Sequence, residues 1–161
     1  MTNNADAQMI LEIINKYVPE VMQTMAGLVA VPGNADLEAP QPASLSGIVG
    51  AIGLTGRANG VVYTAFSQSL ANLITEKILG GEPSSQDVSD VVGELTNMIT
   101  GNVKSQLCDA GFNCSLSIPS VVRGDKITVA SKSAAISVRN EYECEGLSGQ
   151  LVLQVFAVLE K

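Results

Sequence analysis

The strongest constraint on the fold is the long stretch from Ser85 to Asp109, in which apolar residues recur every three or four positions. These residues are Val88, Val91, Val92, Leu95, Met98, Ile99, Val103 and Leu107. Such spacing is typical of an amphipathic helix that packs one side against a core. We therefore predict a helix here, capped by Ser84 or Ser85 and ended by Gly111.

The opposite side of this helix carries an unusual polar set. At about 100° per residue, Asp90, Glu94, Asn97 and Gly101 fall within a band of roughly 60°. Glycine inside a helix costs about 1 kcal/mol relative to alanine, so Gly101 and Gly93 both need a reason. Either these glycines permit tight packing against a neighbouring element, or Gly101 leaves Glu94 and Asn97 unscreened so that another surface can approach.

Composition limits the possible functions. A length of 161 residues suits a single domain over residues 1–161, with a core built from aliphatic side chains because only 4 % of residues are aromatic. The formal charge of −7 argues against nucleic acid or an anionic membrane as the partner. A partner with a basic or metal-loaded contact surface fits better.

The reactive residue types are also restricted. The chain has no histidine, which excludes histidine-based acid–base catalysis and the commonest metal ligand, so we expect no metal site or cofactor of its own. Cys108, Cys114 and Cys144 lack metal-ligand spacing and are expected to be reduced, buried or half-buried thiols. No signal peptide or membrane-spanning run is evident, and we expect a soluble, cytoplasmic protein.

The rest of the chain predicts further helices and a set of strands. The first half should contain a helix from about Asn4 to Met25 that Pro19 kinks or splits, followed by a loop over Val31–Ser46. Strands Gly47–Gly56 and Val61–Phe66 should come next, joined by an Asn59-Gly60 turn, and then a helix over Gln68–Leu79. The second half should contain strands over Phe112–Ile118, Lys126–Ala130, Ala134–Cys144 and Gln150–Leu159. Gly50, Gly53 and Gly56 indicate that a helix packs closely across their strand.

Short turns between these strands predict a mostly antiparallel sheet that two long helices cover on one face, which is an α+β fold. The order of elements repeats, and Gly60–Phe66 loosely resembles Gly149–Phe156, so we predict an internal pseudo-duplication. The first helix also carries a pair spaced like Glu94 and Asn97, namely Glu12 and Asn15. Bulky residues follow that pair and no glycine opens it, which favours an ordinary solvated face.

The motif of the Ser85–Asp109 helix resembles that of a known family. The run Glu94-Leu-Thr-Asn97-Met-Ile-Thr-Gly101-Asn102-Val-Lys104 is similar to the motif of the CheX-type chemotaxis phosphatases, in the wider group that includes the CheC phosphatases. The segment after the helix, Ser117-Ile-Pro119-Ser-Val-Val-Arg-Gly124, is similar to the corresponding segment of that family.

This resemblance implies a function. Family members hydrolyse the aspartyl phosphate of a response regulator such as CheY, and the helix glutamate and asparagine project into the partner's active site. Carried over by position, Glu94 and Asn97 hold those roles here, and Mg²⁺ is expected on the phosphorylated regulator rather than on this chain. The resemblance also implies a single site and a homodimer, for which the terminal strand ending at Leu159 could supply a sheet edge.

The chemistry of the side chains agrees with these roles. An amide such as Asn97 can accept a hydrogen bond from the attacking water while it donates toward phosphoryl oxygens. Phosphoryl oxygens repel a carboxylate, so Glu94 is expected to pair with a cation on the partner rather than to act as a general base. Asn102 falls on the apolar side and is expected to be a buried amide bonded to the sheet or first helix. Asp90 either extends the acidic contact surface or is an ordinary exposed charge.

Two other functions remain open from the sequence. The chain could be a non-catalytic CheC-like or flagellar-switch-like module that binds a receiver domain or a switch protein. It could also be a structural dimer in which the motif is a relic.

Overall fold

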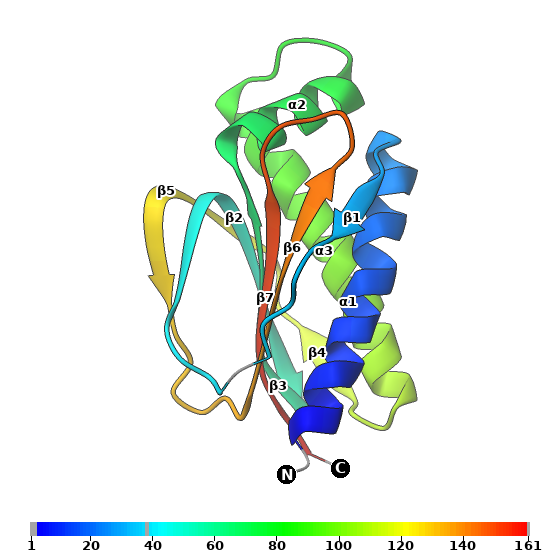
Figure 1. Ribbon diagram of the computed structural model, residues 1–161, viewed down its shortest axis with the longest axis vertical. Coiled ribbons are helices and arrows are strands. Elements are labelled where there is room, and N and C mark those ends of the chain that lie inside the picture. The colour runs from blue at the N-terminus through cyan, green and yellow to red at the C-terminus, as the bar shows by residue number, and fades with distance from the viewer. Residues whose placement is uncertain (1–2, 38, 161) are drawn as a thin grey trace.

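The helix predicted over Ser85–Asp109, α3, lies across one face of a curved antiparallel sheet (Figure 1). This computed structural model describes residues 3–37 and 39–160. The elements in chain order are α1 (Asn3–Ala26), β1 (Ala30–Pro32), β2 (Ala43–Gly56), β3 (Ala58–Phe66), α2 (Gln68–Leu79), α3, β4 (Cys114–Leu116), β5 (Ser120–Val129), β6 (Ile136–Cys144) and β7 (Leu151–Leu159). Every strand pairing is antiparallel, so the predicted α+β class is confirmed.

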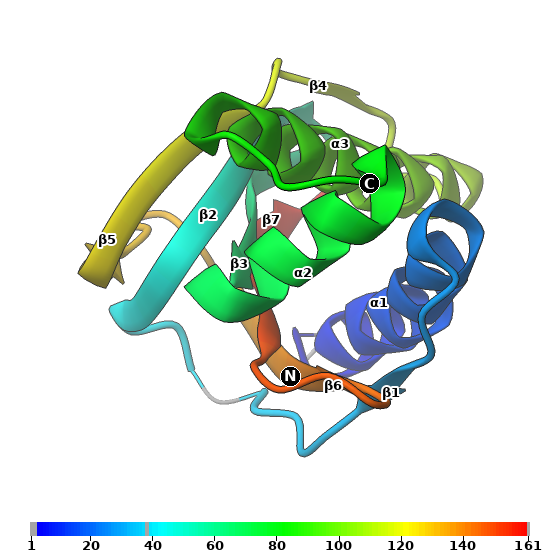
Figure 2. The ribbon, with the colours of Figure 1, turned by 90° about the horizontal axis from the view of Figure 1, so that it is seen from above.

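The helices lie together on one side of the sheet, which curves around them (Figure 2). Both α1 and α3 contact the sheet and one another, and α2 lies at one end of the sheet. The main core fills the space between these layers with aliphatic side chains, among them Ile10, Ile48, Val62, Leu95 and Ile99. The burial of this layer, at about 25 cal/mol per Å² of apolar surface, is the main source of stability.

The order of strands supports the predicted duplication. The sheet runs β1-β6-β7-β3-β2-β4, with β5 pairing on β2 as well. The short strand after each long helix therefore pairs with the hairpin of the other half: β1 with β6, and β4 with β2. At the centre, β3 pairs with β7 over their whole lengths. This arrangement has the connectivity of two similar halves that exchange their short strands.

Several predicted boundaries were wrong. The first helix is not split at Pro19, because α1 runs unbroken to Ala26. The β2–β3 turn lies at Arg57, and the Asn59-Gly60 dipeptide is the start of β3, where Gly60 pairs with Leu54. The strand predicted over Lys126–Ala130 begins earlier, because β5 runs from Ser120 to Val129.

The predicted loop over residues 31–46 was also partly wrong. It contains the end of β1, a bridge between Asp36 and Arg139, and the first residues of β2. Glu38, in the middle of this segment, lies outside the described residues. The terminal strand β7 is paired on both sides, by β6 and β3, so it cannot supply the free edge that was expected of it.

The ends of α3 follow the sequence signals closely. Ser84 forms a capping box: its hydroxyl accepts from the Asp87 N–H at 3.1 Å, and the Asp87 carboxylate accepts from the Ser84 N–H at 2.9 Å. Gly111 follows the helix with φ of 96°, a conformation that favours glycine. Over residues 3–37 and 39–160, none of the helices has both the length and the apolar character needed to cross a bilayer.

Gly50 of β2 determines how closely α3 approaches the sheet. A Cβ at this position would collide with the side chain of Thr96 on α3. The Thr96 hydroxyl is hydrogen-bonded to the hydroxyl of Thr64, which is paired opposite Gly50 on β3. The prediction of close helix packing is confirmed for Gly50, whereas Gly53 and Gly56 face the segment that contains β4.

We predict that Gly50→Ala lowers the free energy of unfolding by roughly 1–3 kcal/mol, because the new methyl group overpacks against Thr96. Denaturant unfolding monitored by circular dichroism measures this change. Gly81→Ala is the matched control, since a Cβ there has no atom within 4 Å. An equal effect in both variants would show that the Gly50–Thr96 contact does not limit packing.

Candidate functional site

The candidate site is the outer face of α3. Glu94 and Asn97 are both exposed and lie one turn apart, as the periodicity predicted. At this spacing side chains are neighbours on the helix surface. Within the described part of the chain, neither side chain has a hydrogen bond or an ion pair. Both polar groups are therefore available to an incoming molecule.

The outward direction of this pair is fixed by the opposite side of the helix. Thr96 is fully buried, and its hydroxyl bonds to Thr64 and to the Val92 carbonyl at 2.7 Å. Near the start of α3, the Arg123 guanidinium of β5 donates to the Ser85 carbonyl and, at 2.7 Å, to the Ser89 hydroxyl. These contacts hold the helix at two places along its length and prevent it from turning.

Gly101, one turn after Asn97, has no packing role inside the chain. A Cβ there would have no atom within 4 Å, whereas a Cβ at Gly93 would make an ordinary contact, 3.6 Å from Val121 Cγ2. The tight-packing alternative therefore does not explain Gly101. The absence of a side chain leaves the surface beside Asn97 flat.

Two flanking residues have local partners. Asp90 is exposed and accepts a hydrogen bond from Gln86 at 2.8 Å, which leaves it on the same surface as Glu94. Asn102 is half-buried, and its amide donates to the Met98 carbonyl of α3 itself at 3.1 Å. The expectation that Asn102 bonds to the sheet or to the first helix was wrong. One turn back along the helix its amide finds a carbonyl acceptor without crossing to another element.

The pair on α1 occupies the corresponding place in the other half. Glu12 lies nine residues after the start of α1, as Glu94 does in α3. Its neighbour Asn15, however, is tied to the sheet: its side-chain oxygen accepts from the Asn140 amide at 2.8 Å and from the Tyr142 hydroxyl at 2.6 Å. Burial raises the pKa of Tyr142, which keeps that hydroxyl protonated as a donor. Asn15 is therefore a structural residue.

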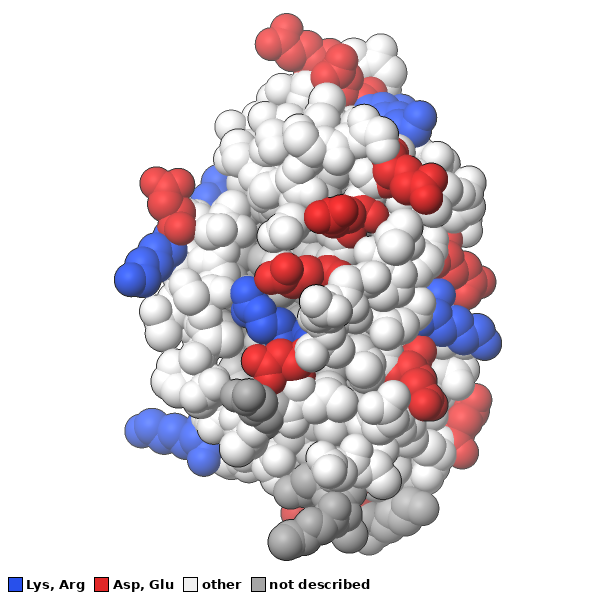
Figure 3. Space-filling view, in the orientation of Figure 1, with Lys and Arg blue, Asp and Glu red and all other residues white. Residues whose placement is uncertain are grey.

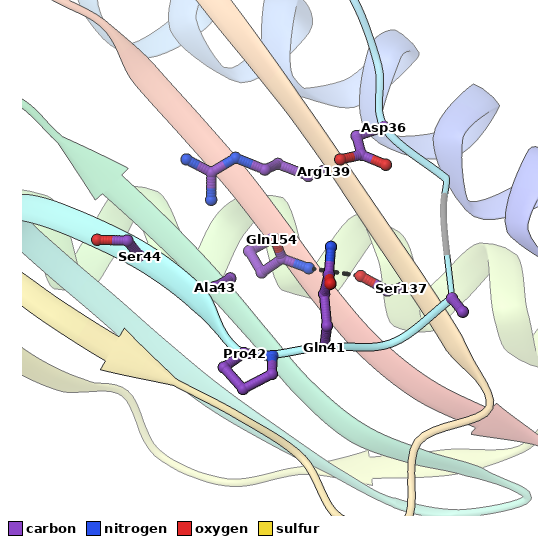
Figure 4. Close-up of a pocket in the computed structure, with 9 residues that line it drawn as sticks. Asp36, Gln41, Pro42, Ala43, Ser44, Ser137, Arg139 and Gln154 are labelled. Atoms are coloured by element: carbon purple, nitrogen blue, oxygen red, sulfur yellow. Dashed lines mark hydrogen bonds between the residues drawn. The ribbon is translucent and has the colours of Figure 1, made fainter.

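The opposite face of the sheet has a hollow of about 220 Å³, lined in part by Asp36, Ser137, Arg139 and Gln154 (Figure 4). The Gln154 amide donates to the Ser137 hydroxyl at 3.0 Å across its floor. Ser137, Arg139 and Gln154 alternate with core residues along β6 and β7, so their side chains point away from the helices. The hollow cannot act together with Glu94 and Asn97.

Charge and thiol placement add little further chemistry. In Figure 3, acidic side chains are spread over the viewed face and basic ones stand as separate groups between them. Among the described residues, no three His, Cys, Asp or Glu side chains gather into a possible metal site. Cys114 and Cys144 are buried, Cys108 is half-buried and all are free thiols, as predicted. Burial raises the pKa of Cys114 and Cys144, which makes them poor nucleophiles.

The sequence reasoning missed two residues around α3. It did not assign Arg123 its role as an anchor, because the contact between β5 and the start of α3 is a tertiary feature that no local pattern indicates. It placed Ile118 at the end of the strand predicted over Phe112–Ile118, whereas β4 ends at Leu116 and Ile118 lies in a short link, 85 % exposed.

Comparison with known proteins gives a consistent result. The family model "Chemotaxis phosphatase CheX" matches residues 48–141, which is more than half of the chain and includes the outer face of α3. No match was found among curated protein sequences.

Solved structures of similar proteins cover most of the chain. A putative chemotaxis protein from Desulfovibrio vulgaris Hildenborough is 26 % identical, with a TM-score of 0.83 over 92 % of this chain and 96 % of that one. The chemotaxis protein CheX from Vibrio vulnificus is 26 % identical, with a TM-score of 0.81 over 92 % and 99 %. The complex of CheX, CheY, BeF3 and Mg²⁺ from Borrelia burgdorferi shares the fold at 17 % identity, with a TM-score of 0.68 over 91 % and 96 %.

We predict that Asn15→Ala and Asn97→Ala differ sharply in stability. Loss of Asn15 leaves the buried Asn140 amide and Tyr142 hydroxyl without their acceptor, which should cost roughly 1–3 kcal/mol. Loss of exposed Asn97 should change the free energy of unfolding by less than about 0.5 kcal/mol. Both variants gain the same helix former, so chemical denaturation of the two isolates the hydrogen-bond network. Similar values would contradict the structural role of Asn15.

We also predict that Gly101→Ala raises the free energy of unfolding by roughly 0.5–1 kcal/mol, since alanine is the better helix former and its methyl group meets nothing. Thermal unfolding followed by circular dichroism would detect this gain. A decrease in stability would mean that Gly101 is required for folding.

Proposed function

Because the chain belongs to the CheX family of chemotaxis phosphatases, we propose that it hydrolyses the aspartyl phosphate of a CheY-type response regulator. In this proposal Asn97 positions the attacking water and Glu94 contacts the partner's active site. The observation that carries it is the exposed Glu94/Asn97 pair, one turn apart on a rigidly held helix and without partners of its own.

The reaction needs little from the phosphatase. An aspartyl phosphate is a mixed anhydride, so water attacks phosphorus, a new O–P bond forms, and the bond from phosphorus to the aspartate oxygen breaks. The products are a free carboxylate and inorganic phosphate, which takes up the oxygen and both protons of the water. The main requirement is that the water lies in line with the departing carboxylate oxygen. A second protein can meet this requirement by placing one polar group.

Asn97 has the properties for this role. Its amide oxygen can accept a hydrogen bond from the water, and its NH₂ group can donate to a phosphoryl oxygen. An amide keeps the same charge at all accessible pH values. The phosphoryl group therefore does not repel it, as it would repel a carboxylate. The rigid setting of α3 reduces the entropy that must be lost when the water is positioned.

Glu94 is better suited to docking. A carboxylate close to the phosphoryl oxygens would be repelled, but it forms strong charge-assisted hydrogen bonds with a cationic side chain. We propose that Glu94 pairs with such a cation at the edge of the partner's active site, which aligns Asn97 one turn away. Asp90 would extend this acidic surface, and Gly101 would give clearance for the backbone of the partner.

The required metal is assigned to the partner. The Borrelia complex contains Mg²⁺ together with BeF3, a group that stands in for a phosphoryl group. We propose that Mg²⁺ binds to the regulator here, and that the protein acts in the cytoplasm, where receiver domains are phosphorylated. A homodimer remains part of the proposal, and pairing of sheet edges would have to use β1, β4 or β5, since β7 is paired on both sides.

The decisive test follows the loss of phosphate from a phosphorylated receiver domain of the chain's own organism. Wild type should accelerate this loss, and Asn97→Ala should reduce the acceleration about a hundredfold because the water is no longer positioned. Asn97→Ala should still bind the same receiver domain loaded with beryllofluoride and Mg²⁺. Glu94→Ala should mainly weaken that binding.

Glu12→Ala is the matched control, because Glu12 has the same place in α1 and is also exposed. Its rate should equal that of wild type. A tenfold loss in Glu12→Ala would indicate a second site. Binding without acceleration by wild type would favour a non-catalytic module that only recognises receiver domains.

A further inference from the structure

We infer that Ile118, in the link between β4 and β5 that runs along α3, is an apolar docking residue that inserts into an apolar depression next to the phosphorylated aspartate of the receiver domain. This inference rests on the proposed function and adds a specificity-determining contact to the same surface. Three observations support it: where Ile118 lies, how exposed its side chain is, and how firmly hydrogen bonds hold its backbone.

The place of Ile118 follows from the elements on either side of it. After the link, Val121 of β5 lies against the Gly93 turn of α3, as the 3.6 Å approach to a Cβ at Gly93 shows. Before the link, Cys114 of β4 lies close enough to Cys108 and Lys104 for both to affect its pKa. The link of residues 117–119 therefore spans the stretch of α3 between positions 93 and 104. Figure 2 shows β4 and the start of β5 beside α3.

Asn97 and Gly101 lie within that stretch of α3, on the side toward the link. With about 100° per residue, Asn97 is roughly 40° from Gly93 around the helix axis, in the direction away from the core. A surface that approaches Asn97 over the open position at Gly101 therefore meets the 117–119 link at the same time.

The exposure of Ile118 is exceptional within this chain. It is 85 % exposed, while Leu79, another exposed aliphatic residue, is 54 % exposed. A single exposed apolar side chain needs no explanation by itself. What distinguishes Ile118 is that its link runs along the stretch of α3 that carries Asn97, whose side chain also has no hydrogen bond within residues 3–37 and 39–160.

The backbone that presents Ile118 is well anchored. The Ser117 N–H donates to the Gly53 carbonyl at 3.0 Å, and the Gly53 N–H donates to the Ser117 hydroxyl oxygen at 2.8 Å. The Ser117 hydroxyl in turn donates to the Ile118 carbonyl at 3.0 Å. The ring of Pro119 fixes the φ angle of that residue, which further restricts the link. An apolar side chain held in this way loses little entropy on binding, so its burial contributes efficiently to affinity.

The chemistry of this surface also defines its partner. Glu94 and Asp90 supply acidic groups, Asn97 supplies an amide, and Ile118 supplies an apolar contact at the other side of the amide. A receiver domain with an apolar depression there would bind well. A receiver domain with a charged side chain there would have to desolvate that charge without a partner, and a bulky side chain there would leave no room for Ile118. Both kinds of receiver domain would be rejected.

The test compares Ile118→Ser with Val122→Ser in turnover of a phosphorylated receiver domain and in binding of the same domain loaded with beryllofluoride and Mg²⁺. Val122 is the matched control because it is also exposed but, as the partner of Val49 on β2, points to the opposite face of the sheet. Ile118→Ser should raise KM and Kd about tenfold and leave kcat within twofold. Val122→Ser should change none of these values, and Ile118→Leu should restore most of the affinity.

The possible failures can be told apart. Unchanged KM and Kd in Ile118→Ser, with an active wild type, would overturn the docking role and leave the phosphatase function intact. A fall in kcat at constant KM would also overturn it, since the residue would then act on the reaction step. If wild type neither binds nor dephosphorylates any receiver domain of its organism, the proposed function fails and the docking role fails with it. Because Ile118 is exposed and lies outside the strands, its variants should keep the melting temperature of wild type.

Discussion

The seat of α3 on the sheet, where Thr96 fits over Gly50, is the contact on which the candidate site depends. Thr96 is buried and hydrogen-bonded to Thr64 on the neighbouring strand, so the helix has one rotational setting. With about 100° per residue, this setting places Asn97 on one side and Glu94 nearly opposite the sheet. The polar pair is thus oriented by a contact that lies entirely in the core.

The two halves of the fold show how one site can arise from a repeated element. In the first half, Asn140 of β6 reaches α1 and binds Asn15 together with Tyr142, so the polar group of that helix is used for structure. In the second half, β2 has Gly50, which has no side chain to engage the helix. Helix α3 therefore lies close to β2, Thr96 fills the space above Gly50, and Asn97 is left exposed. The difference between a structural and an available asparagine therefore lies largely in the strand beneath it.

Periodicity and capping predicted α3 well because both are local signals: Ser84, Asp87 and the apolar stripe determine where the helix begins and which side is buried. The Glu94/Asn97 face followed directly from that stripe. The failures involved tertiary context. Asn59-Gly60 is a common turn dipeptide, yet it pairs inside β3. Asn15 was expected on a solvated face, but its side chain is bonded to the strand beneath it, so that expectation was wrong for Asn15. The place of Ile118 beside α3 depends on β4 and β5 packing against the helix, which no local pattern encodes.

The charge of the chain is consistent with a site that works only when it docks. A net charge of −7 and an exposed glutamate beside the amide disfavour the approach of a free phosphate ion to this face of α3. The phosphoryl group and its neutralising metal would have to arrive already bound to a partner, whose positive potential then matches the acidic face. In such a division of labour the phosphatase needs no acid, base or metal of its own. Under the proposed function, its contribution would be a rigid helix that brings one amide to a defined place, with enough flanking contact to select the correct partner.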